Sequence, residues 1–430
     1  MLSKADNELL VRVGPKTPMG ELFRRFWTPI MLASELGGPD SAPVRVRVLG
    51  EDLVAFRDSH GKLGLLDAYC PHRRANLYWG RNEEDGLRCV YHGWKFDVTG
   101  ACVDLPNCPE GPTLKNKVKT TSYPAMERGG LIWAFMGPSD LMPEFPAIEA
   151  FAVPDEHRSI TKMIARGNYA QMMEGDVDSS HVSFLHSRFD GKPIPGGRVD
   201  AAVFADRMPR WFTAETGYGL MLSAQRDASD DMFHWRVNQY LMPYAVLIAA
   251  PPGNPVLTQV RVPIDDEYSM HFRVWSNADH PISAAERAVL EDGITVPELE
   301  PGTFSTKETY ENDYLIDRAD QARASFTGIT SITAQDLAVT QDQGGYGTIA
   351  DRSREYLTSS DKAIIALRKR LLTSAKQLMQ GHEPPEPRNP KAYSVRPGDF
   401  KLPRTATVVE GAKDLLLTRG DEIISRNVRG

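Results

Sequence analysis

The stretch that decides the fold of this chain holds two cysteines and two histidines in two short loops. The first loop is Cys70-Pro71-His72-Arg73. Sixteen residues separate His72 from the start of the second loop, Cys89-Val90-Tyr91-His92-Gly93-Trp94-Lys95-Phe96. Thiolate sulfur and imidazole nitrogen both bind transition metals. Four such side chains at this spacing predict one metal centre.

Two cysteines on one iron and two histidines on the other are the ligands of a Rieske [2Fe-2S] cluster. Imidazole in place of thiolate raises the reduction potential of such a cluster, which suits one-electron delivery to an oxidising partner. The alternative is a single tetrahedral zinc held by the same side chains. Tyr69, Tyr91 and Trp94 favour the Rieske interpretation, because aromatic neighbours would shield a buried cluster.

The chain has two further cysteines, Cys102 and Cys108, downstream of the second loop. Rieske proteins of respiratory and photosynthetic cytochrome complexes carry an extra cysteine in each cluster loop, joined as a disulfide. The four residues after His72 contain no cysteine. We therefore interpret Cys102 and Cys108 as ordinary small residues, and a chain without a disulfide framework fits a reducing compartment.

Composition is that of an ordinary globular protein with more than one domain. The 430 residues, of which 41% are hydrophobic, support at least two cores. A net charge of −7 gives no reason to expect nucleic acid, although Arg73-Arg74 is a local basic patch that an acidic partner would fit. The chain has neither a long apolar run nor an apolar signal core after Met1. We expect a cytoplasmic protein with no membrane partner.

Residues 1–155 are predicted to form a small antiparallel β domain with the cluster loops at one end. Alternating runs at 44–49 and 53–56 are separated by turn residues, and 131–136 is predicted to be the last buried strand. Apolar residues at helical spacing predict a short helix within 19–34 that packs onto this domain.

Residues 156–430 are predicted to form a second domain, an antiparallel sheet covered by helices. Strand-like runs occur at 235–240, 245–248 and 270–275, and helical patterns follow Ser283 and span 360–379. The predicted fold class is therefore α+β.

A second polar stretch begins this domain: Asn168-x-x-Gln171-x-x-Glu174-Gly175-x-x-Asp178-x-x-His181-x-x-x-x-His186. On a helix most of these residues share one face, and burying a polar face is costly unless it serves a site. Two histidines with one carboxylate form the facial triad of non-haem iron, which leaves positions open for oxygen and substrate. His181 and His186 converge on one metal only if the helix bends or ends near Ser183.

The third ligand must be a carboxylate distant in sequence, and our choice is Asp361. It precedes a helix with apolar residues at helical spacing. Taken alone, an acidic residue there is better explained by the helix dipole. Asp351 is the second candidate and Asp336 the third.

These stretches together resemble the oxygenase component of Rieske non-haem iron aromatic-ring oxygenases of the phthalate dioxygenase type. The resemblance covers most of the chain: residues 6–14, the cluster loops, 168–186 and 360–371. It implies that the cluster is bound by Cys70, His72, Cys89 and His92. It also implies that the iron(II) is bound by His181, His186 and Asp361, since this family carries its ligand aspartate at the head of such a helix.

The resemblance also implies an electron route. A separate flavin and iron–sulfur reductase supplies electrons from NADH, which agrees with the absence of a G-x-G-x-x-G motif after a strand in this chain. The aspartate matching Asp178 bridges the iron histidine to a cluster histidine of the neighbouring subunit, so a homotrimer or stacked trimers are expected. The alternative is that Asp178 only orients His181. Asn168, on the same predicted face, is a second catalytic candidate.

The implied activity is O2-dependent hydroxylation, expected as cis-dihydroxylation, in aromatic hydrocarbon catabolism. The expected substrate is an aromatic carboxylate of the phthalate or phenoxybenzoate kind. An O- or N-demethylase or monooxygenase acting on a methoxylated or other aromatic compound is the alternative. A plain electron carrier is disfavoured because it would not need the second ligand set.

Five residues are candidates for the substrate pocket. Arg207 and Arg236 each offer a guanidinium fork for a carboxylate, though surface ion pairs are their commoner use. Phe184 and Phe189 lie near the ligand histidines, where core packing is the ordinary alternative. Ser179 would reach either the substrate or only the backbone.

Overall fold

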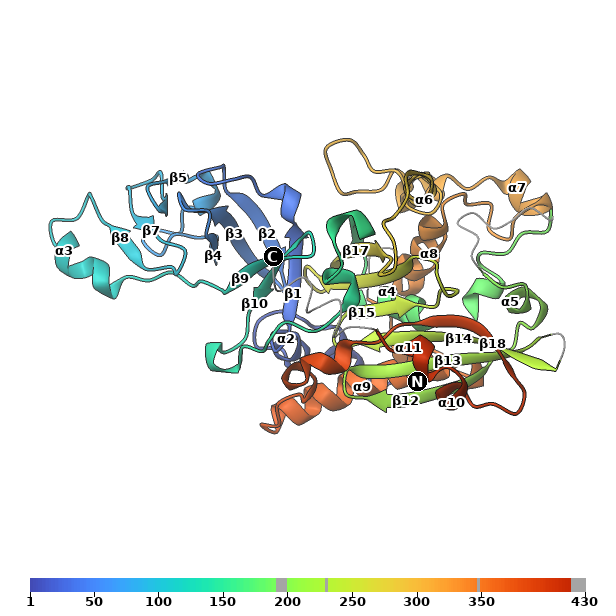
Figure 1. The fold of residues 1–430 in the computed structure, drawn as a ribbon. Helices are drawn as coiled ribbons and strands as arrows, with labels where there is room; N and C mark the ends of the chain where they lie inside the picture. The colour runs from blue at the N-terminus through green and yellow to red at the C-terminus, as the bar shows by residue number, and fades with distance from the viewer. Residues whose placement is uncertain (191–198, 229–230, 346–348, 419–430) are drawn as a thin grey trace. The chain divides into compact units, whose positions relative to one another are not determined.

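The computed structural model describes residues 1–190, 199–228, 231–345 and 349–418, and the chain divides into two compact units. One unit is Val13–Pro143, and the other joins Met1–Arg12 to the described part of Glu144–Gly430 (Figure 1). The boundary therefore differs from the one predicted at residue 155. Helix α1 (Lys4–Val11) belongs to the second unit, where Asp6 pairs with Lys376 of α9 (Lys362–Met379) at 2.6 Å.

The first unit contains three antiparallel sheets and two short helices, α2 (Pro18–Phe23) and α3 (Gly111–Leu114). The sheets, in spatial order, are β1 (Trp27–Leu32), β10 (Leu131–Phe135) and β9 (Ala125–Arg128); β2 (Val44–Val48), β3 (Glu51–Arg57) and β4 (Leu63–Asp67); and β5 (Arg81–Glu83), β6 (Gly86–Arg88), β7 (Lys95–Phe96) and β8 (Cys102–Asp104). The predicted antiparallel β domain is confirmed.

The helix predicted within 19–34 is only half correct. Helix α2 ends at Phe23, and the chain from Trp27 continues as strand β1, paired with β10. The Trp27 and Phe135 rings lie 5.9 Å apart, so this pairing buries the aromatic residues that gave the helical spacing. Contacts with a neighbouring strand override local periodicity here.

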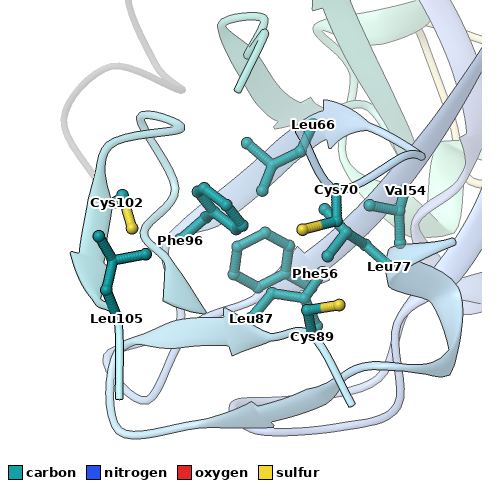
Figure 2. Packing of buried hydrophobic residues seen from close by; sticks show 10 residues of the cluster. All are labelled: Val54, Phe56, Leu66, Cys70, Leu77, Leu87, Cys89, Phe96, Cys102 and Leu105. Atoms are coloured by element: carbon teal, nitrogen blue, oxygen red, sulfur yellow. The ribbon is translucent and has the colours of Figure 1, made fainter. Parts of the chain in front are cut away.

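A hydrophobic cluster lies beside the two loops that carry Cys70 and Cys89 (Figure 2). Its members are Val54, Phe56, Leu66, Cys70, Leu77, Leu87, Cys89, Phe96, Cys102 and Leu105. The two loop cysteines are thus part of a packed core, which fixes where their sulfur atoms lie.

The second unit is built on an eight-stranded antiparallel sheet. Its strands, in spatial order, are β11 (Arg158–Arg166), β17 (Tyr268–Ser276), β16 (Val256–Pro263), β15 (Ala245–Ile248), β14 (Met232–Leu241), β13 (Gly219–Asp227) and β12 (Arg210–Thr216), with β18 (Gly398–Pro403) also paired to β14. This arrangement confirms the predicted α+β class.

Helices cover the sheet. Helix α4 (Tyr169–Val177) lies against β15 and β16 and contacts α8 (Ile332–Gln341), and α9 packs against β12 and β13 (Figure 1). The shorter helices described are α5 (Ala202–Ala205), α6 (Ala284–Leu290), α7 (Arg318–Arg323), α10 (Val408–Gly411) and α11 (Lys413–Leu416). Among the described residues, no helix has the length and apolar character needed to cross a membrane.

One face of the sheet lies beneath α4. The cross-strand pairs Leu257↔Trp275, Gln259↔Arg273 and Arg261↔His271 alternate along β16 and β17, so their side chains share a face. Both Asp176 carboxylate oxygens accept hydrogen bonds from Arg261 at 2.7 Å, which ties α4 to this face. The predicted polar stretch of α4 is therefore anchored to the sheet.

Candidate metal centres and active site

The two cysteine loops of the first unit share one backbone arrangement. The amide of Cys70 donates to the carbonyl of Ala75 at 2.9 Å, and the amide of Cys89 donates to that of Trp94 at 2.8 Å. The fifth residue of each loop has positive φ, Arg74 at 57° and Gly93 at 78°. Each loop is therefore closed by a hydrogen bond from its cysteine, and the residues between the cysteine and its hydrogen-bond partner form the loop tip.

The four predicted cluster ligands lie at these two tips. Cys70 and Cys89 are buried, and the His72 and His92 rings lie 4.6 Å apart. The His72 ring is stacked on Trp94 at 4.4 Å. Burial and the neighbouring Cys89 thiol raise the pKa of Cys70 to about 11. A pair of adjacent thiols beside a pair of adjacent imidazoles is the donor set that a Rieske cluster requires.

The other two cysteines are not part of this group. Figure 2 shows Cys102 on the opposite side of the hydrophobic cluster from Cys70 and Cys89, with aromatic rings between them. All four cysteines are free thiols. Their placement agrees with the interpretation of Cys102 as a packing residue.

The predicted iron histidines follow α4 in the second unit. The helix ends at Val177, and His181 lies in a separate 3-10 turn, His181–Ser183. The helix therefore ends before His181 and the chain turns before His186. This is the condition under which His181 and His186 can reach one metal. The shared helical face predicted for Asn168 through His181 holds only as far as Val177.

Asp336 of α8 joins the two histidines. Its Oδ1 lies 3.2 Å from Nε2 of His186 and 3.6 Å from Nε2 of His181. One ligand atom from each of the three residues lies within 4.8 Å of the others. Two imidazole nitrogens and one carboxylate oxygen on one side of a metal are the facial triad of non-haem iron.

Asp361, our predicted third ligand, is not part of this group. Its Oδ2 accepts hydrogen bonds from the backbone amide and hydroxyl of Thr358, at 2.6 and 3.0 Å, in a capping box that starts the 3-10 turn Ser359–Asp361 directly before α9. Asp351 caps its own turn in the same way through Ser353. Both carboxylates are used as helix caps, which is the ordinary explanation for an acidic residue at such a position. The geometry selects Asp336.

Each histidine of the triad has a second partner at Nδ1. For His181 it is Oδ2 of Asp178, at 3.6 Å, and for His186 it is Oε1 of Gln335, at 2.7 Å. Asp178 also accepts a hydrogen bond from the amide of Ser180 at 2.7 Å. Such partners fix the tautomer and leave Nε2 free for a metal. Sequence reasoning missed Gln335, which precedes Asp336 directly.

Opposite charges gather at the triad. Burial disfavours the charged carboxylate of Asp336, but His186, His181 and Arg261 outweigh it and lower its pKa. Burial also disfavours charge on His181, yet the nearby carboxylates of Asp178 and Asp336 raise its pKa. The carboxylate is therefore ionised at neutral pH and suited to a cation.

The triad opens onto a cavity of about 190 Å³ in the second unit. The sheet face beneath α4 forms one wall, and an apolar group that includes Val182, Ile248, Leu257, Trp275 and Ile332 lines much of the rest. A cavity next to a candidate metal centre that combines apolar walls with convergent polar and charged groups is typical of a small-molecule site.

The five predicted substrate residues divide between two environments. Ser179 and Arg236 line the cavity, though Arg236 is paired with Asp399 at 3.1 Å. Arg207, Phe184 and Phe189 are exposed and are not among the described residues that line it. Arg207 lies over the Phe184 ring at 5.1 Å instead.

Asn168, our second catalytic candidate, has a structural position. Its Oδ1 caps α4 through the amide of Ala170, and its Nδ2 donates to the carbonyls of Val11 and Asp266, at 3.0 and 2.7 Å. It lies at the start of α4, about 13 Å of helix from the residues after Val177. Its hydrogen bonds hold α1 to α4 and give no support to a role in the reaction.

Two family models match the chain. Residues 26–124 match the Rieske [2Fe-2S] domain, and residues 134–395 match the LigXa C-terminal domain like family. The chain belongs to the Rieske non-haem iron oxygenases. A Rieske oxygenase of this type is an oxidoreductase, and it carries a [2Fe-2S] cluster and a mononuclear non-haem iron. The zinc alternative for the cysteine loops is thereby excluded.

Full-length relatives place this Rieske oxygenase among oxygenase components of ring-hydroxylating or demethylating systems. It is 38% identical to the phthalate 4,5-dioxygenase oxygenase subunit of Pseudomonas putida, over 89% of this chain and 88% of that protein. It is 33% identical to the 5,5'-dehydrodivanillate O-demethylase oxygenase subunit of Sphingobium sp., over 89% and 83%.

The fold agrees with a solved structure. The crystal structure of dicamba monooxygenase bound to dicamba superposes with a TM-score of 0.60 at 19% identity, over 84% of this chain and 99% of that one. At this identity the likeness concerns the fold alone. The fold described above is therefore shared with that protein.

Proposed function

We propose that this chain is a terminal oxygenase that uses O2 and electrons from a separate NADH-dependent flavin and iron–sulfur reductase to cis-dihydroxylate an aromatic carboxylate. The observation that carries the proposal is the group His181, His186 and Asp336 at the wall of a cavity. In this proposal these three side chains hold iron(II), and Cys70, His72, Cys89 and His92 hold the cluster. The bound iron supplies the chemistry that activates O2.

The size of the cavity supports a substrate with one ring. A cavity of about 150 Å³ accepts benzene in a well-studied case, so about 190 Å³ accommodates one ring with a small substituent. A phthalate or benzoate kind of substrate therefore fits within this volume. The apolar residues that line the cavity, among them Val182, Leu257 and Trp275, suit the faces of an aromatic ring.

Asp178 supports a proposal about assembly and electron transfer. We infer that the chain forms a trimer or stacked trimers in the cytoplasm, and that Asp178 links His181 to a cluster histidine of the neighbouring subunit. Its carboxylate has His181 on one side and the amide of Ser180 on the other. Asp178→Asn should keep the iron and cluster contents but slow reoxidation of the reduced cluster by the iron site in single-turnover stopped-flow experiments. An unchanged rate would leave Asp178 with an orienting role only.

The activity is tested by turnover with a reductase, NADH and ¹⁸O2 over a panel of benzoates, phthalates and methoxybenzoates. We expect a product heavier by two ¹⁸O atoms from a single-ring carboxylate, with one O2 consumed per NADH. The O-demethylase relative favours the alternative, in which a methoxybenzoate yields formaldehyde and a phenol. NADH consumption without any oxygenated product across the whole panel would contradict an oxygenase function.

A further inference from the structure

A short turn joins the end of α4 to the candidate iron ligand His181, and Ser179 lies within it. Ser179 is 4% exposed and is held by the guanidinium group of Arg226. Nη2 of Arg226 donates to the Ser179 carbonyl at 2.8 Å, and Nη1 and Nη2 each donate to the Ser179 hydroxyl oxygen at 3.3 Å. Arg226 therefore holds both the main chain and the side chain of this turn.

Arg226 joins this turn to two other elements of the second unit. It lies on β13, and its Nε donates to the carbonyl of Asp206, directly after α5, at 3.0 Å. The 3-10 turn that begins at His181 contacts the same helix, because the hydroxyl of Ser183 donates to the carbonyl of Val203 at 2.7 Å. The chain is thus tied to α5 before His181, through Arg226, and after it, through Ser183.

The Arg226 guanidinium is fully buried and charged. Burial and the nearby charge of Arg236 lower its pKa to about 10, which leaves it protonated at neutral pH. The carboxylates of Asp206, Asp399 and Asp178 favour its charge, while its direct hydrogen bonds go to carbonyl and hydroxyl oxygens. Hydrogen bonds from a charged donor are stronger than neutral ones, and a planar guanidinium keeps its donors in fixed directions. This side chain is therefore suited to hold the turn in one conformation.

The contact of Arg226 with the turn is separate from the anchoring of α4 itself. The last turn of that helix is held at Asp176, whose carboxylate accepts from Arg261 and whose carbonyl accepts from Asn238 at 3.2 Å. Arg226 is not among the described residues that line the cavity, whereas Ser179 is. Arg226 therefore acts on the site through Ser179 rather than by contact with a substrate, and its loss should release the turn while the helix stays in place.

We propose that Arg226 is a positioning residue of the mononuclear iron site, and that through Ser179 it fixes the places of His181 and Asp178. The inference rests on the proposed function for the iron that His181 holds. Ser179 directly follows Asp178 and lies two residues before His181, so a movement of its carbonyl group moves both side chains. A ligand imidazole that is free to move binds its metal more weakly and in more than one geometry.

The test uses the holoprotein loaded with iron(II) under anaerobic conditions, with its cluster oxidised and no reductase present. Nitric oxide is the probe, because the EPR spectrum of its iron(II) adduct reports the geometry of the ligands. Wild type should give one narrow signal, and Arg226→Gln a broadened signal or two signals. Iron(II) release to a chelator should be about 10-fold faster in Arg226→Gln. Arg226→Lys keeps the charge but cannot contact Ser179 and Asp206 together, so its release rate should lie between the two.

Arg158→Gln is the matched control. Arg158 is also a buried arginine that donates to the main chain, to the carbonyls of Ala150 and Val153 at 3.3 and 2.7 Å, and it pairs with the exposed Asp155. It is not among the described residues that line the cavity. This variant should lose thermal stability but keep the wild-type EPR signal and the wild-type rate of iron release.

A wild-type EPR signal and release rate in Arg226→Gln would overturn the role of Arg226, and so would a wild-type release rate in Arg226→Lys if only that variant folds. Changes of the same size in Arg158→Gln would also overturn it, because they would show a general effect of lost stability. These results leave the oxygenase function standing. A wild type that gives no nitrosyl signal would overturn the iron site itself, and the role of Arg226 with it.

Discussion

Nδ1 of His186 lies 2.7 Å from Oε1 of Gln335, the residue directly before Asp336 in α8. The amide nitrogen of Gln335 donates to the carbonyl of Ile329 at 2.7 Å, so its oxygen is left to accept from the imidazole. His186 therefore carries its proton on Nδ1 and presents Nε2 toward Asp336. One turn of α8 supplies both a candidate iron ligand and the group that orients another.

Gln335→Leu should weaken iron(II) binding at the mononuclear site. Loss of the acceptor frees the His186 ring to rotate and change tautomer, and removal of such a partner costs about 10- to 100-fold in metal affinity. Competition with a chelator under anaerobic conditions measures this affinity. Gln335→Glu keeps an acceptor at Nδ1 and should bind iron(II) nearly as well as wild type. Gln343→Leu, an exposed glutamine after the same helix, serves as the control; equal affinities for all variants would refute the role of Gln335.

Substitution of a ligand cysteine and substitution of a packing cysteine should have different effects on cluster assembly. Cys89→Ser should abolish the visible absorption and the EPR signal of the reduced cluster, because a hydroxyl is a poor ligand for this iron. Cys102→Ser changes a cysteine that is equally buried in the same hydrophobic cluster and should keep both signals. Loss of the cluster in both variants, with the fold intact by circular dichroism, would contradict the assignment of Cys102 to packing.

Glu174 of α4 should make stability depend on pH. Its carboxylate is buried between Arg352 and Arg368, whose Nε atoms donate to Oε1 at 2.9 and 2.8 Å. Burial alone would raise the pKa of Glu174, but the two guanidinium groups outweigh it and lower the pKa. Because the folded-state pKa lies below the unfolded value, this stabilisation is complete above about pH 5 and is lost as pH falls further.

Glu174→Gln tests that dependence. At pH 7 the substitution leaves the buried guanidinium of Arg352 without a carboxylate and Arg368 with only Glu355, and it should cost about 3 to 5 kcal/mol in the free energy of unfolding. The difference from wild type should shrink as pH is lowered from 6 toward 3, measured by urea unfolding. Glu298→Gln removes an exposed carboxylate paired with Lys307 and should leave stability nearly unchanged. If the difference in unfolding free energy between wild type and Glu174→Gln grew as the pH fell, the lowered pKa of Glu174 would be contradicted.

The positions of the cluster ligands could be predicted from the sequence because the geometry of each loop is local. Cys70 and His72, like Cys89 and His92, lie within one turn of chain, so spacing alone brings each pair to one loop tip. Residues 27–32 could not be predicted in the same way. The helical spacing of Phe26 and Trp27 is real, but pairing with Leu131–Phe135, about a hundred residues away, makes this segment a strand.

The third iron ligand shows where sequence reasoning fails and why. Asp361 and Asp336 both lie on helices, and only the packing of α8 against α4 decides between them. A carboxylate at a helix cap stays in contact with water. Asp336 lies inside a helix, near Ala334 and Leu337, where removing a carboxylate from water costs free energy unless a partner or a metal compensates it. That contrast was available in the sequence.

The assignment of the third ligand is tested most directly by the iron content of three purified proteins. Two cluster irons and one mononuclear iron predict about three irons per chain in wild type. Asp336→Ala should contain about two, with the cluster EPR signal unchanged, and Asp361→Ala should still contain about three. Loss of one iron in Asp361→Ala, with full iron content in Asp336→Ala, would contradict the account.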